Sequence, residues 1–329
     1  MMKTIKTNLL IIAIMVFSIS CSDDNNTSND PTTPLTLTIT LETAQDQMGD
    51  FACNAMALYN GKVWSVGGEN SYSSPDFNSD VWNSANGVAW VSVANNIVGE
   101  RCGHTLTTFN GKLWLIGGEN NAGDWLGDIW YSSDGTAWIN PFLTAPFGNV
   151  AFHNTVVFNG KMYVIAADPD TGNTKVWSSP DGENWTEETT NAFSARVSQK
   201  AVVFNGAMYV IGGENIAGTK LNEIWTSTNG SNWTLITNNA SVFPGINGHT
   251  ATVYNNKVWI IGGRTNAAAY TNAIYYSENL QDWTKYAGLN PIEPIVAHTT
   301  LLYNDAIWVF GGYVGFETTT GKIWSITED

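Results

Sequence analysis

From residue 35 onward the chain repeats one pattern of apolar and polar positions, and residues 104–141 show that pattern in full. Runs of β-prone residues there predict two antiparallel strand pairs, 104–109 with 112–116 and 128–132 with 136–140. Asn110-Gly111 joins the first pair and Asp134-Gly135 joins the second. Both dipeptides favour type I′ turns, in which two consecutive residues have positive φ. One unit of the pattern therefore predicts four antiparallel strands.

The unit recurs along the chain. A glycine doublet follows each second strand at steps of 50, 49, 46, 50 and 49 residues, with Ala166-Ala167 in place of the third doublet. An aromatic residue stands three positions before each doublet, and aromatics eight positions apart mark the outer strands. Fourteen of the 15 tryptophans hold such places, so we expect them in the core between sheets, and only Trp125 falls outside the pattern.

These features resemble the kelch repeat over residues 51–329, with its polar first-strand start, its aromatic-x-x-Gly-Gly strand and its late tryptophan. The resemblance implies a β-propeller, in which four-stranded blades surround a central channel. It does not imply one function, because kelch propellers include protein-binding domains, galactose oxidase and the sialic acid mutarotase. Outer hairpins such as SSDGTAW look like a shortened sialidase-type Asp-box, which is a structural turn and implies no sialidase chemistry.

The sixth repeat stops at its third strand, residues 322–327, which would leave an exposed sheet edge. Residues 35–41 alternate Leu or Ile with Thr and have no other place in the repeats. We predict that this N-terminal strand completes the last blade. The expected fold is all-β, a six-bladed kelch-type β-propeller over residues 35–329.

The first 21 residues are typical of a lipoprotein signal peptide. Lys3 and Lys6 precede an apolar run at 9–17, which is too short to span a bilayer, and small residues precede Cys21. Residues 22–34 are polar and predict a disordered tether. We expect lipidation of Cys21 and an outer-membrane location, facing the cell surface or else the periplasm, with membrane contact only through the anchor. An ordinary cleaved signal is the alternative.

The formal net charge of −15 argues against nucleic acid as a partner, because phosphate backbones would be repelled. Cys53 and Cys102 lie near the starts of adjacent repeats, where a disulfide and two free thiols both remain open. We expect a monomer.

Turn lengths place the variable loops, which follow the doublets, on one face of the propeller, where binding residues concentrate. All three arginines of the chain fall on this face, and so does Trp125, which is either a lid or a stacking platform. Together they could hold a carboxylate-bearing or polyhydroxylated ligand, since Arg offers a planar bidentate fork. Arg101 and Arg196 could instead brace the inter-blade linkers. The candidate ligand-binding residues are Arg101, Arg196, Arg264, Trp125, Glu69, Glu119, Glu214 and Tyr313.

The four histidines share one place in the repeats, five residues before the first-strand aromatic. Four histidines around a channel suggest the hypothesis of a metal site, but equivalent positions on separate blades lie too far apart to bind one ion. The resemblance implies hydrogen-bonding struts instead. The loop at 168–173 departs from a calcium loop in its glycine and its terminal acid. We therefore predict no metal and no cofactor.

The favoured interpretation is a lipid-anchored, non-catalytic binding module for a carbohydrate or protein ligand at the long-loop face. The alternative is a sugar epimerase or mutarotase resembling the sialic acid mutarotase, with an arginine on the sugar carboxylate and Glu119 or Glu214 as acid/base. A purely structural surface protein is the third hypothesis, and the sequence names neither the ligand nor any chemistry.

Overall fold

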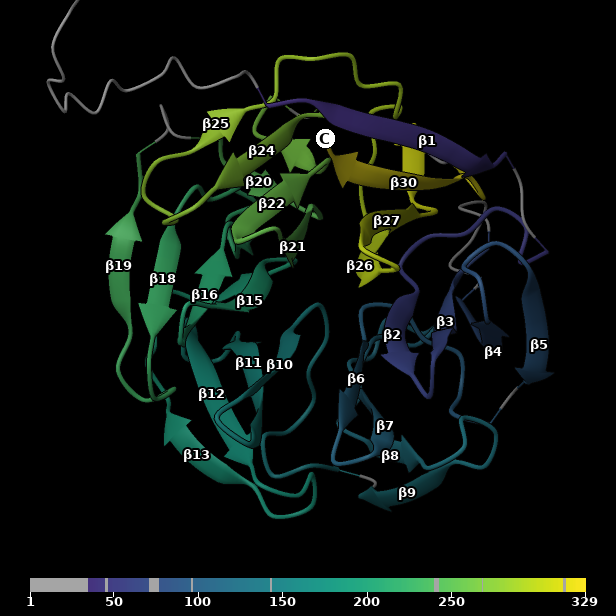
Figure 1. Ribbon diagram of the computed structural model, residues 1–329. Helices are drawn as coiled ribbons and strands as arrows, with labels where there is room; N and C mark the ends of the chain where they lie inside the picture. Colours follow the sequence, from purple (N-terminus) through teal and green to yellow (C-terminus); the bar gives the residue numbers. More distant parts are fainter. Residues whose placement is uncertain are drawn as a thin grey trace, which may run out of the picture. The chain divides into compact units, whose positions relative to one another are not determined.

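The computed structural model describes residues 35–44, 47–70, 77–95, 97–142, 144–239, 243–267, 269–315 and 318–329. The predicted leader, Cys21 and the tether lie outside these residues. Six four-stranded antiparallel sheets are arranged around a common centre (Figure 1). Each innermost strand contacts that of the next sheet, and the last contacts the first, so the circle is closed. This confirms the all-β, six-bladed propeller. In the described portion no helix has the length and apolar character needed to cross a membrane.

The first three blades run from the inside outward in chain order. Blade one contains β2 (Ala55–Tyr59), β3 (Lys62–Glu69), β4 (Phe77–Ser84) and β5 (Trp90–Ala94). Blade two contains β6 (Thr105–Phe109), β7 (Lys112–Ile116), β8 (Ile129–Ser132) and β9 (Ile139–Phe142). Blade three contains β10 (Asn154–Phe158), β11 (Lys161–Asp168), β12 (Asn173–Ser179) and β13 (Thr186–Thr189).

Blades four and five follow the same order, and small two-stranded sheets extend the loop face. Blade four contains β15 (Lys200–Phe204), β16 (Ala207–Ile211), β18 (Ile224–Ser227) and β19 (Thr234–Thr237). Blade five contains β21 (Thr250–Tyr254), β22 (Lys257–Ile261), β24 (Ile274–Ser277) and β25 (Thr284–Lys285). The small sheets pair β14 (Arg196–Val197) with β17 (Glu214–Asn215), β20 (Ile246–Asn247) with β23 (Arg264–Thr265), and β28 (Tyr313–Gly315) with β29 (Thr318–Thr319).

Blade six joins the two ends of the propeller. Its inner strands are β26 (Thr299–Tyr303), β27 (Ala306–Phe310) and β30 (Ile323–Glu328), and its outermost strand is β1 (Leu37–Thr43), which lies antiparallel to β30 (Figure 1). Ile39 pairs with Ile326 and packs against the buried cluster that contains it, whereas Thr40 faces solvent. The predicted closing strand is confirmed, with bounds shifted by two residues.

The two predicted turns have different outcomes. Asn110 and Gly111 have φ of 48° and 70°, as a type I′ turn requires. Of the second pair only Gly135 has positive φ, so the type I′ prediction for Asp134-Gly135 is wrong. The reason is side-chain capping: Asp134 Oδ1 accepts from the amides of Thr136 and Ala137 at 2.7 and 2.8 Å, which holds a longer loop. Those backbone donors lower the pKa of Asp134 to about 2.

The glycine of this outer loop also sets how neighbouring blades pack. A Cβ on Gly135 would collide with the ring of Trp64 in the preceding blade, and one on Gly182 would collide with the ring of Trp114. The aromatic of one blade therefore lies against the bare backbone of the next. This contact explains why aromatic and glycine recur in step along the sequence.

Replacing Ile39 by Asp should lower the free energy of unfolding by about 2 kcal/mol, because the half-buried side chain would put a carboxylate against an apolar cluster. Thr40→Asp is the matched control on the exposed face of the same strand and should change it by less than about 0.5 kcal/mol. Urea unfolding curves measure both. Equal effects of the two substitutions would show that β1 does not seal blade six.

Candidate functional site

A ring of backbone hydrogen bonds surrounds the central channel where the first strands begin. Cys53, Phe152, Ser198 and Ala297 have φ between 52° and 59°, and Gly103 and Gly248 hold the same place in the remaining blades. The amide of Cys53 donates to the carbonyl of Ala297 at 3.0 Å, and similar bonds link blades six to five, five to four, four to three and three to two. Left-handed backbone costs a non-glycine residue roughly 1–2 kcal/mol, so closure of this ring opposes considerable local strain.

The histidines lie just inside this ring, buried, and three of them bond to the preceding blade. His104 Nε2 is 3.0 Å from the carbonyl oxygen of Val66, and His153 Nε2 is 3.3 Å from Thr105 Oγ1. His298 Nε2 is 3.1 Å from Thr250 Oγ1. These contacts fit the strut interpretation. Burial lowers the pKa of all four imidazoles to about 3, so they are neutral at neutral pH. Among the described residues no group of three His, Cys, Asp or Glu is placed to hold a metal ion.

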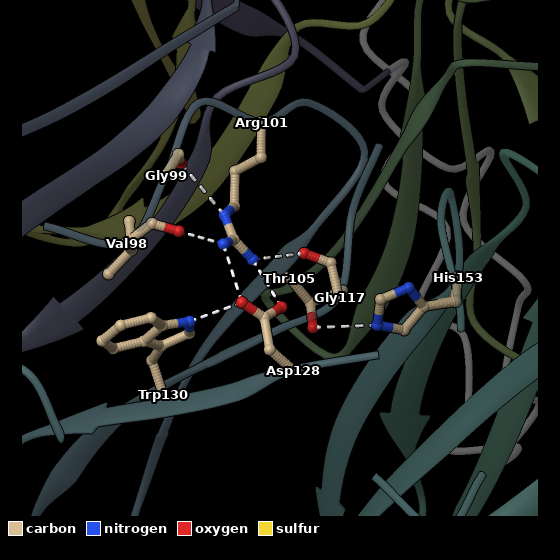
Figure 2. Close-up of polar contacts among 8 residues, drawn as sticks. All are labelled: Val98, Gly99, Arg101, Thr105, Gly117, Asp128, Trp130 and His153. Carbon is tan, nitrogen blue, oxygen red and sulfur yellow. Dashed lines mark hydrogen bonds and ion pairs between the residues drawn. The ribbon is translucent and has the colours of Figure 1, made fainter. Parts of the chain in front are cut away.

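Arg101 and Arg196 are buried braces between linkers and blades. The guanidinium of Arg101 donates hydrogen bonds to both carboxylate oxygens of Asp128, at 2.8 and 2.9 Å (Figure 2). It also donates to the carbonyl oxygens of Val98, Gly99 and Gly117. Trp130 Nε1 donates to the same carboxylate at 2.6 Å. Arg196 repeats the arrangement with Glu223 at 2.6 Å, and Trp225 Nε1 donates to Glu223 at 2.8 Å. Both arginines are at most 2% exposed, so neither offers its fork to a ligand.

Blade three, like blades one, five and six, has no arginine at this place and lacks the brace. Val150 stands where blades two and four have arginine, and Lys175 stands where they have the carboxylate. The indole N–H of Trp177 is consequently buried without an acceptor among the described residues. Ala166-Ala167 also lacks the positive φ of the glycine doublets, so β11 stays extended and pairs with β12 out to Asp168 and Asn173. A regular hairpin therefore projects on the loop face of this blade.

A cavity of about 520 Å³ opens beside that hairpin, between the loops of blades two and three. We call it the Trp125 cavity, and its walls include Trp125, Phe147, Asn149, Asp168, Lys175 and Trp177. Lys175 Nζ bonds to Asp168 Oδ2 at 2.7 Å, and that contact lowers the pKa of Asp168. Aromatic walls with a few fixed polar groups are what small-ligand sites use for affinity and orientation.

Comparison with known proteins agrees with the blade architecture. A model of the KLHDC2/KLHL20/DRC7 Kelch-repeats domain matches residues 152–327, more than half of the chain. The chain belongs to the kelch-repeat family. Its fold is similar to that of a solved structure described as "Structure of YjhT", with a TM-score of 0.70, 18% sequence identity, and coverage of 86% of this chain and 96% of that one. A search of curated proteins found no match.

Of the eight predicted site residues of this kelch propeller, Trp125 is the one found among the described residues that line the Trp125 cavity. Tyr313 donates its hydroxyl to the carboxylate of Glu69, and Glu214 accepts from Asn247 at 2.5 Å and lies 3.3 Å from Lys220 Nζ. Glu119 receives a hydrogen bond from Trp125, yet burial raises the pKa of its carboxyl. Arg264 is exposed on β23 and has no carboxylate partner among the described residues.

The structure adds site residues that pattern reasoning missed. Phe147, Lys175 and Trp177 line the Trp125 cavity. The sequence features that mark this blade as different are the pair Ala166-Ala167 and the short loop that follows it.

Cys53 and Cys102 are free thiols, and a hydrogen bond between them together with burial raises the pKa of Cys102.

The neutral histidines predict acid sensitivity. Since their folded pKa of about 3 lies below the ordinary 6.5, the unfolded chain binds more protons between these values, and stability falls as pH drops below 6.5. His249→Gln copies the glutamine that blade four has at the same place, Gln199. This substitution should reduce the slope of the unfolding free energy against pH between pH 6.5 and 5. The reduction should reach at most about 1.4 kcal/mol per pH unit, which corresponds to one proton. Chemical denaturation at stepped pH measures it. Gln199→Asn is the non-titrating control, and an unchanged slope in His249→Gln would contradict a neutral buried imidazole.

Proposed function

We propose that this kelch propeller is a non-catalytic binding module that takes a glycan in the Trp125 cavity. The observation that carries the proposal is the meeting of Trp125, Phe147 and Trp177 with the Asp168–Lys175 pair in one cavity of about 520 Å³. Sugar rings present apolar C–H faces and hydroxyl edges. Aromatic walls suit the first, and charged or amide groups suit the second.

The geometry favours a glycan over a protein ligand. A stable protein interface buries roughly 800 Å² on each partner, usually across a broad surface, whereas this site is concave and of small-ligand size. The burial of Arg101 and Arg196 and the net charge of −15 favour a neutral glycan over an anionic one. As part of the same proposal, Cys21 carries a lipid anchor and the propeller stands on the outer membrane, either at the cell surface or in the periplasm.

A glycan array with the purified chain should identify neutral ligands, and isothermal titration then gives their affinity. Trp125→Ala should weaken binding at least about tenfold, the effect of losing ~1.4 kcal/mol from one central aromatic contact. Ile216→Ala is the matched control, because Ile216 is an apolar loop residue on the same face and is 78% exposed. An array without any bound glycan, or equal affinity of both variants, would contradict the proposal.

A mutarotase is the second candidate, and Glu119 is the observation that favours it. Burial raises the pKa of this carboxyl, and it lies against Trp125, so it has the character of a general acid/base near the cavity. Glu214 is engaged by Lys220 and Asn247, and Arg264 is the arginine left exposed for a sugar carboxylate.

NMR exchange spectroscopy on an equilibrating sialic acid separates the two functions. For a binding module we expect the anomer exchange rate to be the same with and without protein. If the wild-type chain accelerates exchange and Glu119→Gln does not, the mutarotase replaces the binding module as the proposed function. Glu183→Gln, on an exposed outer loop, controls for the change of charge.

A further inference from the structure

The central channel holds a second polar cavity, separate from the Trp125 cavity. It measures about 100 Å³ and lies inside the backbone ring, with Gln199, Lys200, His104, His153 and His298 among its lining residues. Lys200 is the first residue of β15, and the first-strand positions that correspond to it in the other blades carry Ala, Thr or Asn. Blade four thus departs from the repeat by putting a cation into the channel.

The position of Lys200 brings its charge near several blades at once. It lowers the pKa of His153, His249 and His298, which belong to blades three, five and six. Across the channel the thiol of Cys53 in blade one also interacts with it electrostatically. Lys200 lines the channel cavity together with residues from every other blade, so its side chain is placed in the channel.

No counter-charge accompanies this ammonium in the described structure. No Asp or Glu is among the described residues lining the channel cavity, and the ammonium of Lys200 has neither an ion pair nor a hydrogen bond with any of them. Burying an ammonium without a partner is costly, so most buried charges in proteins are paired. Lys200 is half-buried, and desolvation of its ammonium lowers its pKa.

Neutral hydrogen-bonding groups without partners lie around the same cavity. Gln199 is 1% exposed, and neither its amide nitrogen nor its amide oxygen has a partner among the described residues. His153 is 6% exposed, and its Nδ1 is likewise unpartnered. Buried polar groups in native proteins nearly always have a partner, so this concentration at one cavity indicates that the channel has an occupant.

We propose that the channel binds a small anion, a halide or a short carboxylate, beside the ammonium of Lys200 and the amide of Gln199. An anion supplies the negative charge that the described lining residues do not provide. It also accepts hydrogen bonds from the ammonium and from N–H groups. The cavity is about one fifth the volume of the Trp125 cavity, which favours a small anion over a sugar. This proposal does not depend on the glycan-binding function.

The probes are sodium bromide and sodium formate, each titrated into the full chain at constant ionic strength with sodium gluconate, whose bulky anion serves as the size control. The thermal midpoint of the wild type should rise and saturate with at least one of the two. Lys200→Met keeps the side-chain length and should weaken the apparent affinity at least tenfold. Gln199→Leu should weaken it several-fold. Lys285→Met, which removes an exposed lysine of blade five, should respond as the wild type does.

Crystals grown in sodium bromide give a readout that does not need a folded variant. An anomalous peak beside Lys200 Nζ supports the proposal, and loss of that peak in Lys200→Met strengthens it. Water alone at that place both in bromide crystals and in formate crystals, no midpoint response to either anion, or an unchanged response in Lys200→Met would each overturn it. A response to formate alone identifies a carboxylate site, and a response to both identifies a general small-anion site.

Discussion

Closure of the inner circle is the constraint on which the rest of this structure depends. A residue in the left-handed conformation stands two positions before each first strand, and five backbone hydrogen bonds link these residues between blades, among them the bond from Cys53 of blade one to Ala297 of blade six. Such bonds require adjacent first strands to start at the same height and at a constant angle. The bonds hold neighbouring first strands in register around the channel, and the residues that follow them line the channel cavity, among them three of the histidines, Gln199 and Lys200. At the outer radius β1 completes the closure by supplying the fourth strand of blade six.

Features that every blade needs were predictable because they repeat. The strand pairs, the Asn110-Gly111 turn and the closing strand at 35–41 all follow from periodicity and turn chemistry, and the structure confirms them. The strand predicted at 136–140 is displaced to β9, because the capped loop after Ser132 is longer than a two-residue turn. The Asp134-Gly135 turn was predicted wrongly because the dipeptide alone does not reveal that Ser132 and Asp134 cap the loop amides. Gly135 is needed there for a further reason, the close contact with Trp64, which no local rule contains.

The candidate site was predictable only in part, because arginine can either bind a ligand or hold a structural ion pair. Arg101 looks the same in sequence whether it grips a ligand or Asp128, and its partner lies 27 residues away. The structure shows the rule for the brace: the carboxylate stands two residues before the third-strand tryptophan, as Asp128 does before Trp130. The rule holds again for Glu223 and Trp225, and it fails in blade three at Lys175. Sequence reasoning placed Trp125 on the correct face, but it could not place Phe147 or Trp177 beside it.

Departures from the repeat carry more information about function than the repeat does. Six blades face nearly the same packing problem, so a residue that the other blades replace without loss is not required for closure. Blades two and four have an arginine and a carboxylate at the places of Val150 and Lys175, and other blades have threonine at the place of Lys200. Those residues are therefore compatible with the fold. Val150 with Lys175 leaves open space beside Trp177 that blades two and four fill with a brace. Lys200 places a half-buried ammonium in the channel without a counter-ion, which costs stability. The Lys200 charge occurs in blade four alone, and its cost is physically reasonable where the unpaired charge has a ligand.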